Sequence, residues 1–189
     1  MERVPRGAGR VANVERRSRK KEEAANRRTW PVCFRHRGLG LKQEAPEGLR
    51  KVKPVLLDTG CIVALLDRSE RYHPQCKQKI QGLSAPLITC EAVIAEACYL
   101  VRHLRGASEA ILENVRSGVF QIPLQLSQEA GDVKRILGKY GDREIDLADA
   151  CLIALANRYE AGMVLTLDKD FQIYRWGRNK AFELLLEVD

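Results

Sequence analysis

Hydrophobic and polar positions divide the chain into two unlike parts. From Met1 to about Lys53, Arg, Lys, Gly and Glu dominate and no apolar period is sustained. Such a segment cannot bury enough surface to offset the entropy of ordering it. After Pro54 the pattern changes abruptly, because VLLDTGCIVALL contains one charged residue in twelve. We therefore expect one folded domain over 54–189 and a disordered basic arm over 1–53.

Short apolar runs alternate with helical patterns in the second part. Strands are predicted at VLL, PLIT, VFQIPL, MVLTL and FELLLEV. Helices are predicted near 59–66, 72–80, 91–104, 107–116, 127–139 and 146–162. We expect Thr89 and Ser127 to act as N-caps, and Gly162 to close the last helix. This alternation is typical of an α/β fold, a three-layer sandwich with a mostly parallel sheet flanked by helices.

The net charge of +7 belongs to the first part alone. Residues 1–53 contain 16 Lys and Arg against 6 Asp and Glu, which leaves 16 basic and 19 acidic residues for 54–189. A basic arm can bind phosphates without sequence preference. The acidic remainder gives no such signal, so the overall charge says little about the folded domain.

Export and membrane insertion are not indicated. No run reaches the roughly 18 to 20 uncharged apolar residues of a membrane helix, and the first residues lack the apolar stretch of a secretory signal. The six cysteines form no C-x-x-C pair, which argues against structural zinc and fits reduced thiols. We expect a cytoplasmic protein without a membrane partner.

Four acidic residues have unusually apolar surroundings, where an ionised carboxylate is costly unless it is compensated. They are Asp58, Glu96, Asp149 and Asp168. In an open parallel sheet, ligands gather beyond the carboxyl ends of the strands, and Asp58 and Asp168 follow two predicted strands. Converging carboxylates repel one another unless they are protonated or bind a hard cation such as Mg²⁺ or Mn²⁺. The pattern favours metal-dependent hydrolysis of a nucleic acid.

Each acid also has a purely structural interpretation. Asp149 could be a first-turn acid favoured by the helix dipole, with Asp146 as the N-cap. Asp168 or Asp170 could cap a short helix, Glu96 could lie exposed on a helix edge, and Asp58 could hold a tight turn. It is less probable that all four acids have such separate structural roles at the ends of elements than that any one of them does.

These residues, with the D-L-A-D-A-C-L-I-A-L-A helix and the T-L-D-K-D-F run, closely resemble the PIN-domain nucleases, in particular VapC-like toxin ribonucleases of type II toxin–antitoxin systems. The resemblance runs from about Pro54 to the C-terminus. It implies that Asp58, Glu96, Asp149 and Asp168 bind the metal and carry catalysis, and that Thr59 is the hydroxyl residue beside the first acid. Asp146 and Asp170 are uncertain neighbours. It also implies a Mg²⁺- or Mn²⁺-dependent endoribonuclease, commonly a homodimer, that acts on RNA and is neutralised by a cognate antitoxin.

The first 53 residues depart from that family, whose members usually begin just before the first strand. Met1 and Met163 are the only methionines, so a GTG-type start at Val52 or Val55 would make the arm a mis-annotated start. A genuine RNA-binding extension is the alternative. Arg175, Arg178 and Lys180 follow the T-L-D-K-D-F run and could contact phosphates; a solvated face is equally compatible.

Other classes fit less well. The Asp-Thr-Gly at 58–60 resembles an aspartic protease loop, but that class pairs two such loops in an all-β frame, and here one copy precedes predicted helices. A receiver domain would need a pair of acids at the first strand and a Lys at the last. A non-catalytic RNA-binding module, or an RNA-processing PIN protein outside a toxin–antitoxin pair, remains the main alternative.

Overall fold

The structure, a computed structural model, describes residues 52–188. The predicted basic arm lies outside the described residues except for its last two positions. Every helix, strand and contact below belongs to the described part of the chain.

A five-stranded parallel sheet forms the middle of the domain, in the order β3-β2-β1-β4-β7. Its strands, in chain order, are β1 (Val55–Leu57), β2 (Leu87–Ile88), β3 (Phe120–Gln121), β4 (Met163–Leu165) and β7 (Glu183–Leu184). β1 lies at the centre, pairing with β2 on one side and with β4 on the other. All four strand pairings are parallel, so the carboxyl ends of all five strands lie along one edge.

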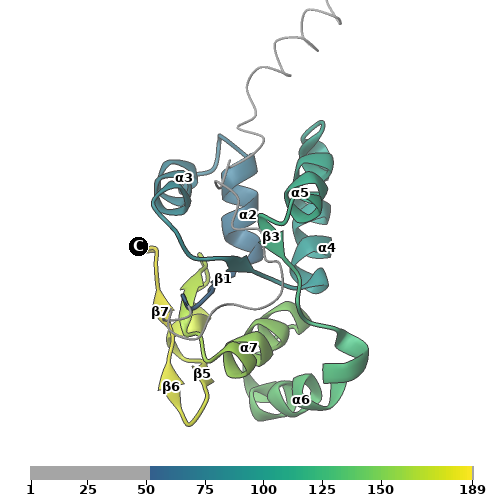
Figure 1. Ribbon diagram of the computed structural model, residues 1–189, viewed down its shortest axis with the longest axis vertical. Helices are drawn as coiled ribbons and strands as arrows, with labels where there is room; N and C mark the ends of the chain where they lie inside the picture. The colour runs from purple at the N-terminus through teal and green to yellow at the C-terminus, as the bar shows by residue number, and fades with distance from the viewer. Residues whose placement is uncertain (1–51, 189) are drawn as a thin grey trace, which may run out of the picture. The chain divides into compact units, whose positions relative to one another are not determined.

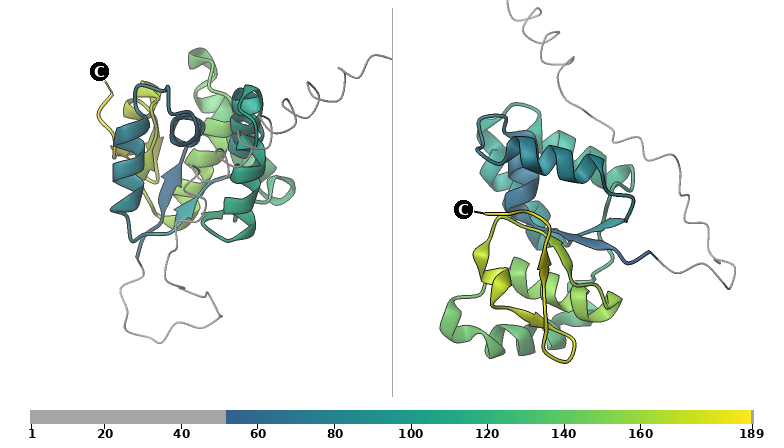
Figure 2. Two further views of the ribbon diagram at one scale, coloured as in Figure 1. Left: turned by 90° about the horizontal axis from the view of Figure 1, so that it is seen from above. Right: turned by 90° about the vertical axis from the view of Figure 1, so that its left-hand side faces the viewer.

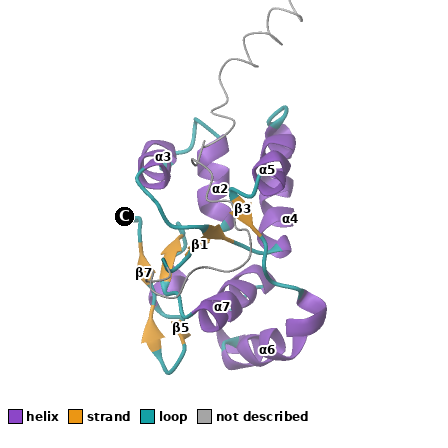
Figure 3. Cartoon of the chain, in the orientation of Figure 1, coloured by secondary structure: helices purple, strands orange, loops and turns teal. Residues whose placement is uncertain are grey.

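Helices cover both sides of this sheet, as Figures 1 and 2 show. One group consists of α2 (Thr59–Leu66), α3 (His73–Gln81), α4 (Glu91–Leu100) with its 3-10 extension η1 (Val101–His103), and α5 (Ala107–Arg116). The other consists of α6 (Leu126–Lys139) and α7 (Leu147–Tyr159). The strands are two or three residues long, whereas these helices run from 8 to 14 residues, and Figure 3 shows both by colour. The predicted three-layer α/β sandwich is confirmed.

Burial explains why the central elements are so apolar in sequence. All three β1 residues are fully buried. In α7, every residue from Ala148 to Ala156 is buried, so this helix is enclosed on all sides and lacks the polar face of a surface helix. An acid within such a segment is therefore forced into an apolar environment. Within residues 52–188, no helix has the length and apolarity needed to cross a membrane.

Three predicted helix ends were wrong. Cys90, not Thr89, occupies the N-cap of α4, because the Thr89 hydroxyl instead donates to the Leu57 carbonyl across the sheet (2.8 Å). α6 begins at Leu126 after Gln125, without a side-chain cap, so Ser127 lies inside the helix. α7 ends at Tyr159, and Gly162 does not close it: the C-cap is Glu160, which takes the left-handed conformation (φ 48°) expected of a glycine.

Gly162 is needed for close packing. A Cβ at this position would lie 2.3 Å from Nε1 of Trp176. Trp176 belongs to an antiparallel ribbon that the sequence did not predict, formed by β5 (Arg175–Trp176) and β6 (Lys180–Ala181). The Gly177 amide at its turn donates to Asn157 Oδ1 of α7 (2.6 Å). The ribbon is thus fixed to the helix that carries Asp149.

Candidate active site

Two of the predicted acids lie just beyond the carboxyl ends of the neighbouring strands β1 and β4. Asp58 is the residue after β1, and Asp168 is the third residue after β4. The Asp58 amide donates to the Leu165 carbonyl at the end of β4 (3.0 Å), which joins the two strand ends. Asp149 enters from the first turn of α7, and Glu96 lies in the middle of α4.

Asp58 is a buried carboxylate that accepts one hydrogen bond on each oxygen. Its Oδ1 accepts from the Thr59 amide (2.6 Å), so Asp58 is the N-cap of α2. Its Oδ2 accepts from the hydroxyl of Thr166 (2.7 Å). Oδ1 of Asp58 thus has a structural role, at the start of a helix and not in the tight turn considered above. That role does not account for the buried hydroxyl directed at Oδ2.

Thr166 connects Asp58 with Asp168. Its side chain is fully buried, and while the hydroxyl donates to Asp58, its oxygen accepts from the Asp168 amide (2.8 Å). Thr166 thus positions both the Asp58 side chain after β1 and the Asp168 backbone after β4. Asp168 is half-buried and also caps the 3-10 turn η3 (Lys169–Gln172), since Oδ1 accepts from the Asp170 amide (2.9 Å).

Glu96 is exposed on its helix, yet it faces the same site. The hydroxyl of Thr59 donates to Glu96 Oε2 (2.7 Å), and Thr59 itself is buried beside Asp58. Thr59 therefore spans from the start of α2 to the middle of α4. The helix-edge interpretation is right about exposure, and the hydrogen bond adds a fixed direction to the carboxylate.

Asp149 is held from two sides. Asp146 is the N-cap of α7, and its Oδ1 accepts from the Asp149 amide (2.8 Å). Asp149 stands at the capping-box position, from which an acid often reaches back to the cap backbone. Its Oδ2 instead accepts from the hydroxyl of Tyr174 (3.2 Å), a contact between buried groups. The N-cap role of Asp146 is confirmed, while the Asp149 carboxylate is engaged elsewhere.

Burial, and to a smaller extent the neighbouring negative charges, raise the pKa of two of these acids. Burial raises the pKa of Asp58 to about 6; the hydrogen bonds from Thr166 and Thr59 oppose this, and the negative charges of Asp168 and Glu96 add to it. Burial also raises the pKa of Asp149 to about 8, reinforced by the charges of Asp146, Asp58 and Asp168. The sheet edge thus brings Asp58, Asp149 and Asp168 within mutual reach, with Glu96 on the Asp58 side.

The remaining predicted residues have differing environments. Asp170 is exposed, and its negative charge adds to the rise in the pKa of Tyr174. One guanidinium nitrogen of Arg175 donates to the carbonyls of Gln172, Ile173 and Tyr174 (2.7 to 2.8 Å), so this side chain closes the turn after η3. Arg178 and Lys180 are exposed on the ribbon, with the Lys180 ammonium 4.6 Å from the centre of the Trp176 ring.

Two residues at this edge were missed by the sequence analysis. They are Thr166 and Tyr174, the hydroxyl donors to Asp58 and Asp149. A lone charge in an apolar segment is conspicuous, whereas threonine and tyrosine are common in such segments. The only signal was the position of Thr166, two residues before an acid already singled out.

The donor chemistry suits a hard divalent cation. Carboxylate oxygens are the ligands that Mg²⁺ and Mn²⁺ prefer. Burial and the neighbouring negative charges that raise the pKa of Asp58 and Asp149 disfavour their ionised forms, and a bound cation would relieve this cost. Within residues 52–188, no group of three or more Asp, Glu, His or Cys side chains is arranged to hold a metal ion. Mg²⁺ usually keeps several waters and takes one or two carboxylates, so a pair of these acids suits its coordination.

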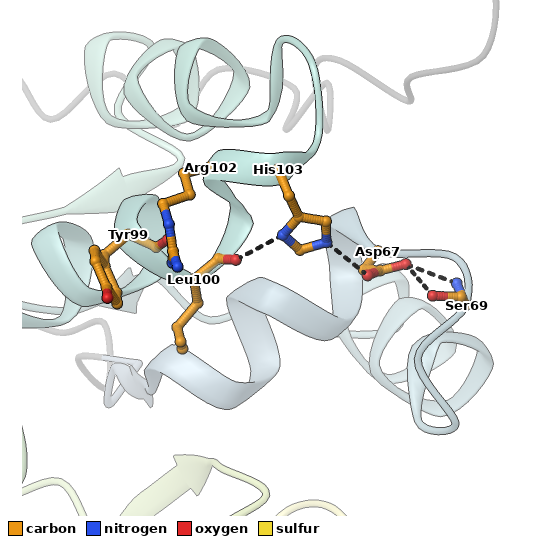
Figure 4. A network of polar contacts seen from close by, with 6 residues as sticks. All are labelled: Asp67, Ser69, Tyr99, Leu100, Arg102 and His103. Atoms are coloured by element: carbon orange, nitrogen blue, oxygen red, sulfur yellow. Dashed lines mark hydrogen bonds and ion pairs between the residues drawn. The ribbon is translucent and has the colours of Figure 1, made fainter.

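A second polar cluster links the C-terminal ends of two helices: α2, which begins with Thr59, and α4, which carries Glu96 (Figure 4). Asp67 caps the end of α2 and accepts from the Ser69 hydroxyl and amide, which lower its pKa. His103 in η1 lies 3.6 Å from Asp67 and contacts the Leu100 carbonyl through Nδ1 (3.0 Å). The cluster links α2 to the end of α4 and leaves the acids untouched.

Known proteins resemble this chain in sequence and in fold. Residues 55–177 match the model of the PIN domain, so the chain belongs to the PIN domain family. It is 32% identical over 117 residues to ribonuclease VapC26 of Mycobacterium tuberculosis (strain ATCC 25618 / H37Rv), a match covering 61% of this chain and 87% of that protein. The predicted resemblance to VapC-like PIN nucleases is confirmed.

A solved structure shares the fold. The crystal structure of Mycobacterium tuberculosis VapC20, described as a sarcin–ricin loop cleaving toxin, superimposes with a TM-score of 0.57 at 20% identity. The match covers 63% of this chain and 93% of that one. At this identity the likeness shows the fold.

Proposed function

We propose that this chain is a Mg²⁺- or Mn²⁺-dependent endoribonuclease that hydrolyses RNA phosphodiester bonds as the toxin of a toxin–antitoxin pair. The observation that carries the proposal is the set of mutually repelling acids at the carboxyl edge of a PIN-domain sheet. A module that only binds RNA gains nothing from acids that face a polyanion. The similarity to a ribonuclease supports the same substrate class.

Asp58, Asp149 and Asp168 would hold the cation, with Glu96 as a further carboxylate on the α4 side. A bound divalent cation supplies an activated water and offsets negative charge on the phosphate. Asp168 is favoured over Asp170 because its charge acts on both Asp58 and Asp149. Thr59 and Thr166 would hold the carboxylates in place through their hydroxyl donors.

Phosphate contacts would come from the ribbon. Arg178 and Lys180 are exposed there, whereas Arg175 is committed to three carbonyls, which makes it the weakest of the three predicted RNA contacts. A VapC-like protein of this kind would work in the cytoplasm, as a homodimer, and be neutralised by a cognate antitoxin. The domain over 54–189 would carry the whole active site.

The test compares the wild type with Asp58→Asn and Asp149→Asn on a structured RNA pool in Mg²⁺ or Mn²⁺, with an EDTA control. Each variant keeps the side-chain shape and removes one charge, so we expect cleavage to fall at least 100-fold while the protein stays folded. Asp132→Asn is the matched control, because Asp132 is an exposed acid on α6 that pairs with Arg135. It should cleave like the wild type.

Two outcomes would contradict the proposal. Cleavage that survives both EDTA and Asp149→Asn would mean that the acids are structural. RNA binding without cleavage in either metal would favour the non-catalytic module. Growth arrest on expression, relieved by the product of a neighbouring gene, separates a toxin from an RNA-processing PIN protein.

A further inference from the structure

Tyr174 is the only aromatic hydroxyl in the described residues recorded as donating to one of the four acids. It is fully buried, and its hydroxyl donates to Oδ2 of Asp149 (3.2 Å).

The ring of Tyr174 has little freedom to move. It meets the Tyr140 ring at 5.1 Å and the Phe171 ring at 5.4 Å, both edge to face. The turn that carries it is closed by the Tyr174 amide donating to the Asp170 carbonyl (3.0 Å). Arg175 then closes the same turn from its other side through three carbonyls.

This turn begins at Asp168, the N-cap of η3. Tyr174 therefore belongs to the segment that carries Asp168, and its hydroxyl donates to Asp149 on α7. Its bond uses Oδ2 of Asp149 and leaves Oδ1 out of the contact. A rigid donor on one carboxylate oxygen fixes the direction in which the other oxygen faces.

We infer that Tyr174 is a positioning residue that orients the Asp149 carboxylate toward a bound divalent cation, with Arg175 holding the turn that carries it. The inference rests on the proposed function for its cation. Outer-shell donors of this kind typically change metal affinity or activity about 10- to 100-fold when removed. Tyr174→Phe deletes the hydroxyl and keeps the ring.

Tyr140→Phe is a matched control from the same aromatic cluster. The Tyr140 hydroxyl accepts from the Arg175 amide (2.9 Å) and contacts none of the four acids. Both variants lose one phenolic oxygen beside the same turn. A difference between them therefore reports the bond to Asp149 and not the packing of the cluster.

The experiment titrates Mn²⁺ into the full-length wild type and both variants by calorimetry, without RNA, and then measures kcat and KM for RNA cleavage. We expect Tyr174→Phe to weaken Mn²⁺ binding and lower kcat by about 10-fold or more, with KM for RNA and the melting temperature in EDTA nearly unchanged. Tyr140→Phe should match the wild type in Mn²⁺ affinity and kcat.

Equal Mn²⁺ affinity in all three proteins would overturn the inference, as would equal losses in both variants or a change confined to KM. The calorimetric arm needs no RNA. If the wild type binds Mn²⁺ and cleaves no RNA, the proposed function fails while the role of Tyr174 is still decided. If the wild type cleaves RNA and Tyr174→Phe binds Mn²⁺ normally, only this inference fails. A wild type that binds no Mn²⁺ overturns both.

Discussion

Replacing Asp149 with asparagine should make the metal-free protein more stable while abolishing its activity. Asp149 is 9% exposed and faces the charges of Asp146, Asp58 and Asp168. Asparagine keeps an oxygen that can accept from the Tyr174 hydroxyl. Its amide nitrogen would face carboxylates as a donor, so that the substitution turns a repulsion into an attraction.

The magnitude follows from the pKa of Asp149. A pKa of about 8 in the folded protein against the ordinary 3.8 costs the fold about 4 kcal/mol at pH 7. Because the amide must also leave water, we expect the variant to recover about half of this, roughly 2 kcal/mol, or roughly 5 to 10 °C in Tm for a fold of this size.

The raised pKa of Asp149 also determines how the free energy of unfolding changes with pH. Since the folded state holds the proton more tightly than the unfolded chain, the wild type loses stability as the pH rises from about 4 to about 8. Asp149→Asn removes this loss. The difference in free energy of unfolding between the two proteins should therefore be small near pH 4.5 and largest near pH 8.

The assay is urea unfolding of both proteins in EDTA across that pH range, with Asp132→Asn as the control. Asp132 is exposed and paired with Arg135, so its loss should change stability by less than about 1 kcal/mol. Excess Mn²⁺ should raise the Tm of the wild type more than that of Asp149→Asn, since a ligand stabilises the state that binds it. An Asp149→Asn protein no more stable than the wild type at pH 8 would refute the reasoning.

Two further predictions concern the fold. Gly162→Ala should destabilise the domain by about 1 to 3 kcal/mol, because its Cβ would overlap the Trp176 ring; Gly131→Ala, which meets nothing within 4 Å on α6, should instead gain about 0.5 to 1 kcal/mol in urea unfolding. A chain beginning at Val52 should keep its Tm and the proposed metal-dependent cleavage, and its affinity for RNA should be lower and less sensitive to salt because it lacks the basic arm. A large drop in Tm would show instead that residues 1–51 contribute to the folded domain.

The parallel sheet was predictable because its strands are buried on both faces. β1 and β4 are continuous apolar runs, and such runs between helical patterns have few other structural explanations. The ribbon of β5 and β6 could not be read in the same way. Its strands are two residues long, and Lys180 and Ala181 are exposed, so no periodicity distinguishes them from a loop.

The acids were predictable for a different reason, since a charge inside an apolar run requires compensation. The compensating groups were not. Thr166 and Tyr174 come from segments whose contact with Asp58 and Asp149 is set by tertiary packing, over separations of 108 and 25 residues. Arg175 shows the same limit: its charge suggested a phosphate contact, and the sequence did not indicate that one of its guanidinium nitrogens donates to three nearby carbonyls.

The hydroxyl donors compensate only part of the cost of placing these acids at the sheet edge. Each donor stabilises one carboxylate oxygen, but the pKa values of Asp58 and Asp149 stay raised, so the hydrogen bonds offset only part of the burial and repulsion. The remaining cost in free energy is offset by the apolar core, in which β1 and nine consecutive residues of α7 are buried. The core holds the acids close together, and their repulsion lowers the stability of the fold. A bound divalent cation would relieve this repulsion, and the free energy recovered would add to its binding affinity. Binding affinity and metal-free stability should thus change in opposite directions when one of these charges is deleted.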